Sequence, residues 1–176
     1  MRIKFSASAL LLAAGLSVWA QEPVQLASGK ALTFSTAGAR TVFSIPKATG
    51  RTGRLYVERD ATVAEGANPT SVKLVAEIPG AALILVDTYP SILGAMSYCQ
   101  AGQEAFLRVV AISSKRPVET YHIKLESCRD NIELASPGLN WTPETKTLDI
   151  HWLSAPGGAG KPENRTLKIR PDGKTE

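Results

Sequence analysis

The stretch AFLRVVAISSKRPVETYHIKLESC, residues 105–128, decides the fold class. Apolar and polar side chains alternate on both sides of the turn-forming segment Ser114–Val118, as in two antiparallel strands that each bury one face. We therefore predict a hairpin of Ala105–Ser113 and Glu119–Ser127. Its apolar, core-facing pairs would be Leu107–Leu125, Val109–Ile123 and Ala111–Tyr121. Its mixed pairs, on the opposite face, would be Phe106–Glu126, Arg108–Lys124 and Val110–His122.

The same alternation recurs before and after this hairpin. Across the turn at 143–146 it places Trp141 beside Leu148 and Leu139 beside Ile150. Further β-rich runs cover 40–45, 53–58, 71–77, 82–87 and 165–170, with glycine and proline between them. Roughly nine to eleven short strands and no internal repeat predict an all-β fold, an antiparallel β-sandwich or barrel. The segment Pro90–Ser97 fits either a short helix or a loop.

Residues 1–20 have the layout of a secretory signal peptide. A positive start at Met1–Lys4 precedes the uncharged, apolar run Phe5–Leu16, and Val18–Ala20 offers a cleavage site before Gln21. A buried N-terminal helix is the alternative. We expect a single β domain over 21–176, periplasmic or secreted, with no transmembrane anchor after the signal is removed. Cleavage would lower the number of basic side chains from 20 to 18, against 16 acidic ones, and we expect no nucleic-acid partner.

The two cysteines, Cys99 and Cys128, are expected to form a disulfide bond. An even pair in an exported chain is most often a structural disulfide, whereas a metal site would need more ligands and a C-x-x-C spacing that the sequence lacks. Cys128 follows the predicted hairpin directly, and Cys99 precedes it by a few residues. The bond would clamp the open end of the hairpin to the segment that enters it.

Few residues suggest catalysis, and no cofactor or metal is expected. Asp149 and His151 lie two apart on one predicted strand, so both share a face and could hold a metal ion or form an oriented base. No nucleophile motif accompanies them, and a solvated polar face is the alternative. The segment Gly157–Pro162 looks like a phosphate loop, but Pro162 stands where magnesium binding needs Ser or Thr. Four carboxylates could pair in space for acid–base chemistry: Glu58, Asp60, Asp87 and Glu104.

The candidate partner-binding residues are Lys47, Arg51 and Arg54. No acidic residue occurs from Pro23 to Val57, and these three cations surround a glycine-containing turn. Long cations on a turn favour an anionic partner, such as an acidic protein surface; a solvated basic face is the alternative. A second candidate surface, also compatible with a loop tucked over the domain, holds Tyr89, Pro90, Ile92, Leu93, Met96 and Tyr98.

These features predict an exported, non-catalytic binding domain of the cell envelope that recognises or inhibits another protein. One alternative is a small envelope hydrolase or metal-dependent enzyme that uses Asp149 and His151. Another is a structural or assembly factor that offers an exposed edge strand to a second chain.

Overall fold

The computed structural model describes residues 23–47, 50–92 and 102–176, and these residues form strands and turns but no helix. Three antiparallel sheets result. The first contains, in spatial order, β1 (Val24–Gln25), β2 (Ala31–Ala37), β3 (Arg40–Pro46) and β4 (Thr52–Glu58). The second contains β5 (Ser71–Ile78), β6 (Ala82–Pro90), β7 (Gln103–Ala111) and β8 (Val118–Ser127). The third contains β9 (Glu133–Thr142), β10 (Thr147–Ser154) and β11 (Glu163–Lys168), with β10 in the middle.

The all-β prediction is confirmed, and the barrel alternative is wrong. Each sheet is open and ends in edge strands within the described residues. Within the same residues, no helix is long and apolar enough to cross a membrane. The predicted signal peptide, Cys99 and most of the segment Pro90–Ser97 lie outside the described residues.

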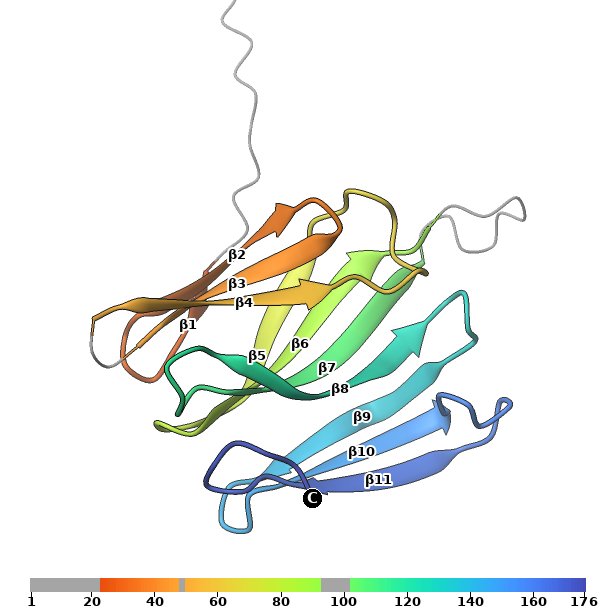
Figure 1. Cartoon of the computed structure of the whole chain (residues 1–176). Coiled ribbons are helices and arrows are strands. Elements are labelled where there is room, and N and C mark those ends of the chain that lie inside the picture. The colour runs from red at the N-terminus through yellow and green to blue at the C-terminus, as the bar shows by residue number, and fades with distance from the viewer. Residues whose placement is uncertain (1–22, 48–49, 93–101) are drawn as a thin grey trace, which may run out of the picture.

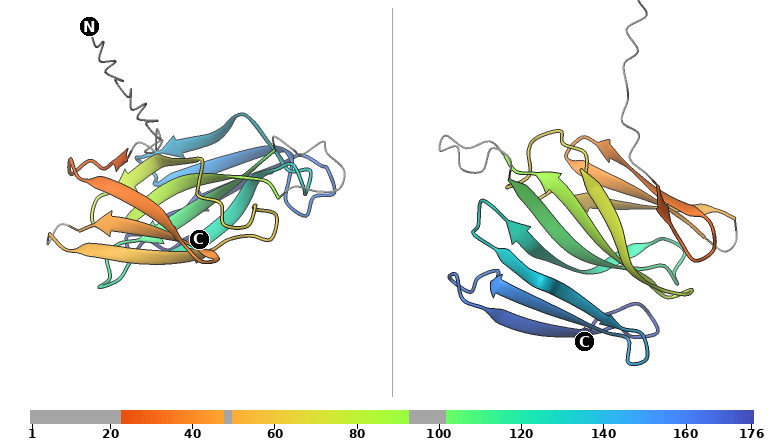
Figure 2. Two further views of the ribbon diagram at one scale, coloured as in Figure 1. Left: turned by 90° about the horizontal axis from the view of Figure 1, so that it is seen from above. Right: turned by 180° about the vertical axis from the view of Figure 1, so that it is seen from behind.

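The sheets stack in three layers, with β5–β8 between the other two (Figures 1 and 2). Alternate residues of the central strands therefore enter two different cores. Ile84, Leu107 and Val109 pack toward the third sheet, while Leu83 and Leu85 pack toward the first. The partners in the third sheet are Leu148, Ile150, Trp152 and Leu167; those in the first are Leu32, Phe43, Ile45, Leu55 and Val57. Full burial of each such side chain stabilises the fold by roughly 1.5–3 kcal/mol.

The predicted hairpin over 105–127 forms as β7 and β8, with the predicted faces but a different register. Leu107 pairs with Ile123 and Val109 with Tyr121, so each partner lies two residues earlier in β8 than predicted. The connection is longer than the predicted turn, and two bulges interrupt the ladder. The shift is one residue before the first bulge, two residues between the bulges and three residues after the second. Leu107, Val109 and Leu125 nevertheless keep the predicted face and share the core with the third sheet.

The prediction that this hairpin buries one face only is wrong. On the face expected to be mixed and solvated, Phe106, Arg108 and Val110 are at most 4% exposed, as is Glu104. The first sheet covers this face of β7, whereas His122 and Glu126 on the same face of β8 stay exposed. Alternation within one strand reveals which residues share a face, but not whether a second sheet covers the polar one.

The second predicted hairpin is confirmed as to residues and register. Trp141 pairs with Leu148, Leu139 with Ile150 and Asn140 with Asp149. Trp152 continues the buried row and donates a hydrogen bond from Nε1 to the carbonyl oxygen of Leu125, 3.1 Å away. This bond ties the third sheet to β8.

Charged groups are buried between the first and second sheets. Arg108 Nε donates to both carboxylate oxygens of Asp87, at 2.8 and 2.9 Å, and Arg108 Nη1 donates to Glu119 at 2.6 Å. The hydroxyl of Tyr89 bonds to Asp87 at 2.6 Å and to Thr41 of β3 at 2.9 Å. The network therefore joins the central sheet to the layer above it.

Arg108→Met should destabilise the fold by about 3–5 kcal/mol, because it leaves the Asp87 carboxylate buried without its cation. Arg40→Met is the matched control: Arg40 and Glu58 lie as close, at 2.6 Å, but are more than half exposed. We expect the control to cost about 0–1 kcal/mol. Denaturant unfolding measures both; equal effects would contradict the burial of the Arg108 pair.

Candidate functional site

Turns from three hairpins that are distant in sequence lie together at one end of the molecule. Successive hairpins reverse direction, so the β1–β2, β3–β4 and β7–β8 connections fall at the same end (Figure 1). Lys30 Nζ donates to the carbonyl oxygen of Lys47 at 3.0 Å. Lys47 Nζ in turn donates to the carbonyl oxygens of Ser114, at 2.7 Å, and Lys115. Each turn is thereby held against the next.

A glycine allows β4 to approach the β7–β8 connection. The inward side of Gly53 faces the buried ring of Pro117, and a Cβ atom at this position would lie 2.6 Å from two carbons of that ring. Any larger residue would force the two segments apart. The close approach brings Arg51 and Arg54 to the end of the molecule that also holds Lys115 and Arg116.

We name the cations of this end the basic end surface: Lys30, Lys47, Arg51, Arg54, Lys115 and Arg116. All are exposed except Lys47, which is partly buried. The segments 26–30, 50–54 and 112–117, together with Lys47, contain no carboxylate of their own. One carboxylate reaches them from β5: Glu77 Oε2 accepts a hydrogen bond from the Ala27 N–H at 2.6 Å, in the β1–β2 turn. Like charges from separate loops produce a positive potential over one face, which favours anionic partners and disfavours cationic ones.

The predicted residues Lys47, Arg51 and Arg54 lie together in the structure, but Lys47 differs from the two arginines in its contacts. The ammonium group of Lys47 is occupied with the backbone of the β7–β8 connection. Arg51 and Arg54 project from exposed positions on and beside the turn. Lys47 therefore holds the β7–β8 connection in position, and the two arginines are left exposed to solvent.

Sequence reasoning missed Lys30, Lys115 and Arg116, which complete the basic end surface. The signal that could have found them is the order of hairpins. In a run of antiparallel strands, every second connection falls at the same end.

No protein-family model, curated protein or solved structure matches this chain.

The four carboxylates considered for acid–base chemistry lie in three different places. Glu58 pairs with Arg40 on the first sheet, and Asp87 pairs with Arg108 in the buried network. Only Asp60 and Glu104 come together. Both accept a hydrogen bond from the Thr62 hydroxyl, at 2.7 and 2.9 Å.

A cation lies against this carboxylate pair. Lys124 Nζ is 3.1 Å from Asp60 and 3.9 Å from Glu104, donates to Asp130, and stands 5.7 Å from the centre of the Phe106 ring. Burial alone disfavours the ammonium group, but Asp130 and Asp60 outweigh it and raise the pKa of Lys124. Asp60, Glu104 and Asp130 thus form an ionic cluster around Lys124, in which the cation neutralises part of the negative charge.

Burial and hydrogen bonds set the protonation of the Asp87 network. Burial raises the pKa of Asp87, and Arg108 opposes this rise. Burial, with the nearby Asp87 carboxylate, raises the pKa of Tyr89, so its phenol keeps its proton and donates. The polar groups of this network satisfy one another's hydrogen bonds beneath the first sheet. The network therefore links the first and second sheets structurally.

Asp149 and His151 share the predicted face of β10, but each bonds to β11. Asp149 accepts from Thr166 Oγ1 at 2.6 Å, and His151 Nδ1 lies 2.9 Å from Asn164 Oδ1. Among the described residues, no three histidine, cysteine, aspartate or glutamate side chains lie together as a metal site. In the part of the chain that the structure describes, Asp149 and His151 therefore have no third side chain beside them that would complete a metal site.

The second candidate surface changes in part. Tyr89 is 1% exposed and belongs to the buried network, whereas Ile92 is 38% exposed. Leu93, Met96 and Tyr98 lie outside the described residues.

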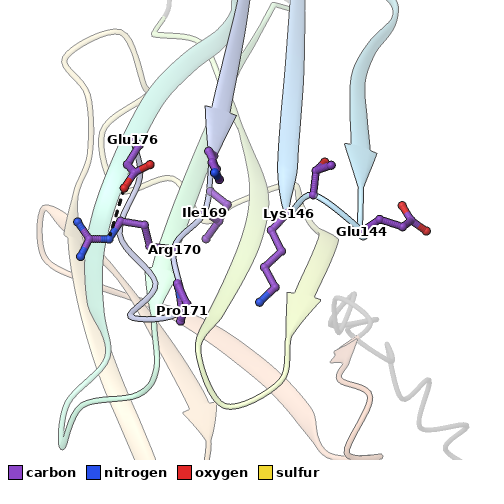
Figure 3. A pocket seen from close by; sticks show the side chains of 8 residues that line it. Glu144, Lys146, Ile169, Arg170, Pro171 and Glu176 are labelled. Carbon is purple, nitrogen blue, oxygen red and sulfur yellow. Dashed lines mark ion pairs between the residues drawn. The ribbon is translucent and has the colours of Figure 1, made fainter.

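A pocket of about 610 Å³ lies between the β9–β10 turn and the segment after β11 (Figure 3). Lys146 and Glu144 come from the turn, and Arg170 points toward Glu176, with an ion pair of 3.7 Å. Both signs of charge line the pocket, so its field selects neither anions nor cations. The basic end surface, whose loops contribute cations and no carboxylate of their own, is the stronger candidate.

The pH dependence of stability should report the Lys124 cluster. Burial of Asp60 by itself raises its pKa, but hydrogen bonds from Thr62 and the charge of Lys124 lower it below its ordinary value. A lowered pKa stabilises the fold above the unfolded value of about 4, and this contribution is lost as the pH falls toward the folded value. Asp60→Asn and Lys124→Met should each weaken the fall in melting temperature below about pH 4. An unchanged acid dependence in both would contradict the assignment.

Proposed function

We propose that this protein is an exported, non-catalytic binding domain that recognises an acidic surface of another protein through the basic end surface. The observation that carries the proposal is the gathering of cations from three separate loops whose own residues include no carboxylate; Glu77 of β5 reaches only the β1–β2 loop, at Ala27. Arg51 and Arg54 contact the partner, and Lys47 holds their turn in place. By occupying an acidic site, the domain would inhibit an envelope protein whose activity depends on that site.

Complementary charge acts mainly on encounter and selectivity. Exposed cations steer an anionic partner toward the correct face and repel cationic surfaces, whereas they contribute little to folding stability. The effect weakens as salt shortens the screening length from about 30 Å at 0.01 M to about 10 Å at 0.1 M. Binding should therefore be strongest at low ionic strength.

Export is part of the proposal. A leader over residues 1–20, cleaved before Gln21, would deliver the domain to the periplasm or the cell exterior. In that oxidising environment Cys128, which directly follows β8, would bond to Cys99.

Charge reversal at the basic end surface tests the binding proposal. Arg51→Glu with Arg54→Glu should weaken binding of poly-L-glutamate by about tenfold or more at low salt and leave the melting temperature nearly unchanged. Isothermal titration calorimetry at two salt concentrations measures this loss.

A matched control distinguishes the effect of where the charge is changed from the effect of the change in net charge. Arg129→Glu with Lys161→Glu makes the same change of net charge at exposed positions in the β8–β9 and β10–β11 connections, at the opposite end. The control should retain wild-type affinity. An equal loss in both variants, or in neither, would show that the basic end surface is not the binding site.

The disulfide predicts a simple chemical result. Thiol labelling of the unfolded, unreduced protein should find no free sulfhydryl, and reduction should release both cysteines. Loss of the bond should destabilise the fold by about 2–5 kcal/mol. Two labelled thiols before reduction would refute the pairing.

A further inference from the structure

The open edge of β4 borders the basic end surface. Hydrogen bonds place the residues of β4 alternately toward β3 and away from it. Lys47 donates its N–H to the Arg51 carbonyl at 2.8 Å, and Arg59 donates to Ala39 at 3.3 Å. Since bonding alternates along an antiparallel pair, Gly53, Leu55 and Val57 bond to β3. The N–H and C=O groups that point to the open edge belong to Thr52, Arg54, Tyr56 and Glu58.

These four residues also carry the exposed side chains of β4. Their side chains are all exposed, and Tyr56 is 53% exposed, whereas the three inward residues are buried. No hydrogen bond from another described element reaches their outward backbone groups. Both Figure 1 and the left view of Figure 2 show β4 at the rim of the first sheet.

Among the edge strands that the structure describes, β4 and most of β11 are regular and uncovered, and of the two only β4 carries a cation of the basic end surface, Arg54. Natural edges are protected by short length, bulges, proline, charged side chains or a covering segment. β1 has two residues, β5, β8 and β9 contain bulges, and Lys168 of β11 bonds to Glu176 of the following segment. β4 has seven residues in regular register with β3 and contains no proline.

We propose that β4 accepts an extended, acidic peptide segment of the partner as an added strand. This inference rests on the proposed function and names the form in which the partner binds. Main-chain hydrogen bonds to the four outward residues would supply affinity, and side chains would supply selectivity. A carboxylate opposite Arg54 would lie within the roughly 4.5–5.5 Å Cβ spacing of cross-strand pairs.

The charges along the edge favour this occupant over a second copy of the chain. Arg51, Arg54, Lys115 and Arg116 surround one half, while Glu58 at the other end is neutralised by Arg40. The added strand is therefore acidic beside Thr52–Arg54. An antiparallel second copy centred on Leu55 would place Arg51 opposite Arg59 and Arg54 opposite Tyr56. A copy centred on Tyr56 would place Arg54 opposite Glu58, whose carboxylate already pairs with Arg40.

Amide hydrogen exchange of the mature protein with a short synthetic peptide of alternating glutamate and threonine tests the inference. In the free protein, the amides of Arg54 and Tyr56 should exchange fast and those of Leu55 and Val57 slowly. A saturating amount of peptide should slow exchange at Arg54 and Tyr56 by about tenfold or more. A peptide of alternating lysine and threonine is the negative control.

Two variants of Tyr56 separate the backbone from the side chain. Tyr56→Pro removes an outward N–H and no bond to β3, and should weaken peptide binding by about tenfold or more. Tyr56→Thr keeps the N–H and should retain most of the affinity. Exchange in the wild-type protein decides the question even if the proline variant does not fold.

The possible results distinguish this inference from the proposed function. Binding that depends on Arg51 and Arg54 but leaves the outward amides unprotected overturns strand addition and leaves the proposed function standing. Absence of binding by both the peptide and poly-L-glutamate overturns both. If the outward amides of β4 become more protected as the protein concentration rises, without any peptide, a second copy of the chain occupies the edge. That result would overturn the proposal that an acidic strand binds there.

Discussion

Burial of the central sheet on both faces is the constraint on which the rest of the structure depends. A sheet covered on both sides must carry apolar or fully paired groups on both faces. β7 meets this condition by placing Leu107 and Val109 in one core and pairing Arg108 with Asp87 in the other layer. Tyr89 extends the pairing to Thr41 of β3. The buried ion pair costs desolvation energy, and its hydrogen bonds to Glu119 and Tyr89 offset that cost.

The basic end surface follows from the same stacking. Because the first sheet lies on the central one, β4 stands over the start of β8, and Gly53 meets Pro117. Lys47 then reaches the backbone of the β7–β8 connection. Cations that are more than 60 residues apart in sequence, such as Arg51 and Arg116, thereby share one end. The open edge of β4 lies beside them, so charge and unpaired backbone groups offer a partner adjacent contacts.

Local alternation was sufficient to predict most of the strands, though not β1 and β2, and one hairpin register, because period and turn chemistry are short-range properties. Pairs such as Trp141–Leu148 follow from a tight turn, because the bulges of β9 and β10 lie beyond Ile150, further from the turn. The register of β7 and β8 could not be predicted in this way, because the alternation of apolar and polar residues does not reveal the two bulges or the longer connection. The burial of Arg108 was missed because it depends on a sheet formed elsewhere in the chain. For the same reason Lys47, Arg51 and Arg54 were found as a local cluster, while Lys115 and Arg116 required the topology.

Native-state hydrogen exchange across all three sheets tests the three-layer account most directly. Amides bonded between β6 and β7 lie in the layer that is covered on both sides, so they should open only with global unfolding and exchange most slowly. Amides between β2 and β3, and between β10 and β11, belong to layers with one open face and should exchange faster. Slowest exchange in either outer sheet, with β7 no better protected than β3 or β10, would contradict the central position of β5–β8.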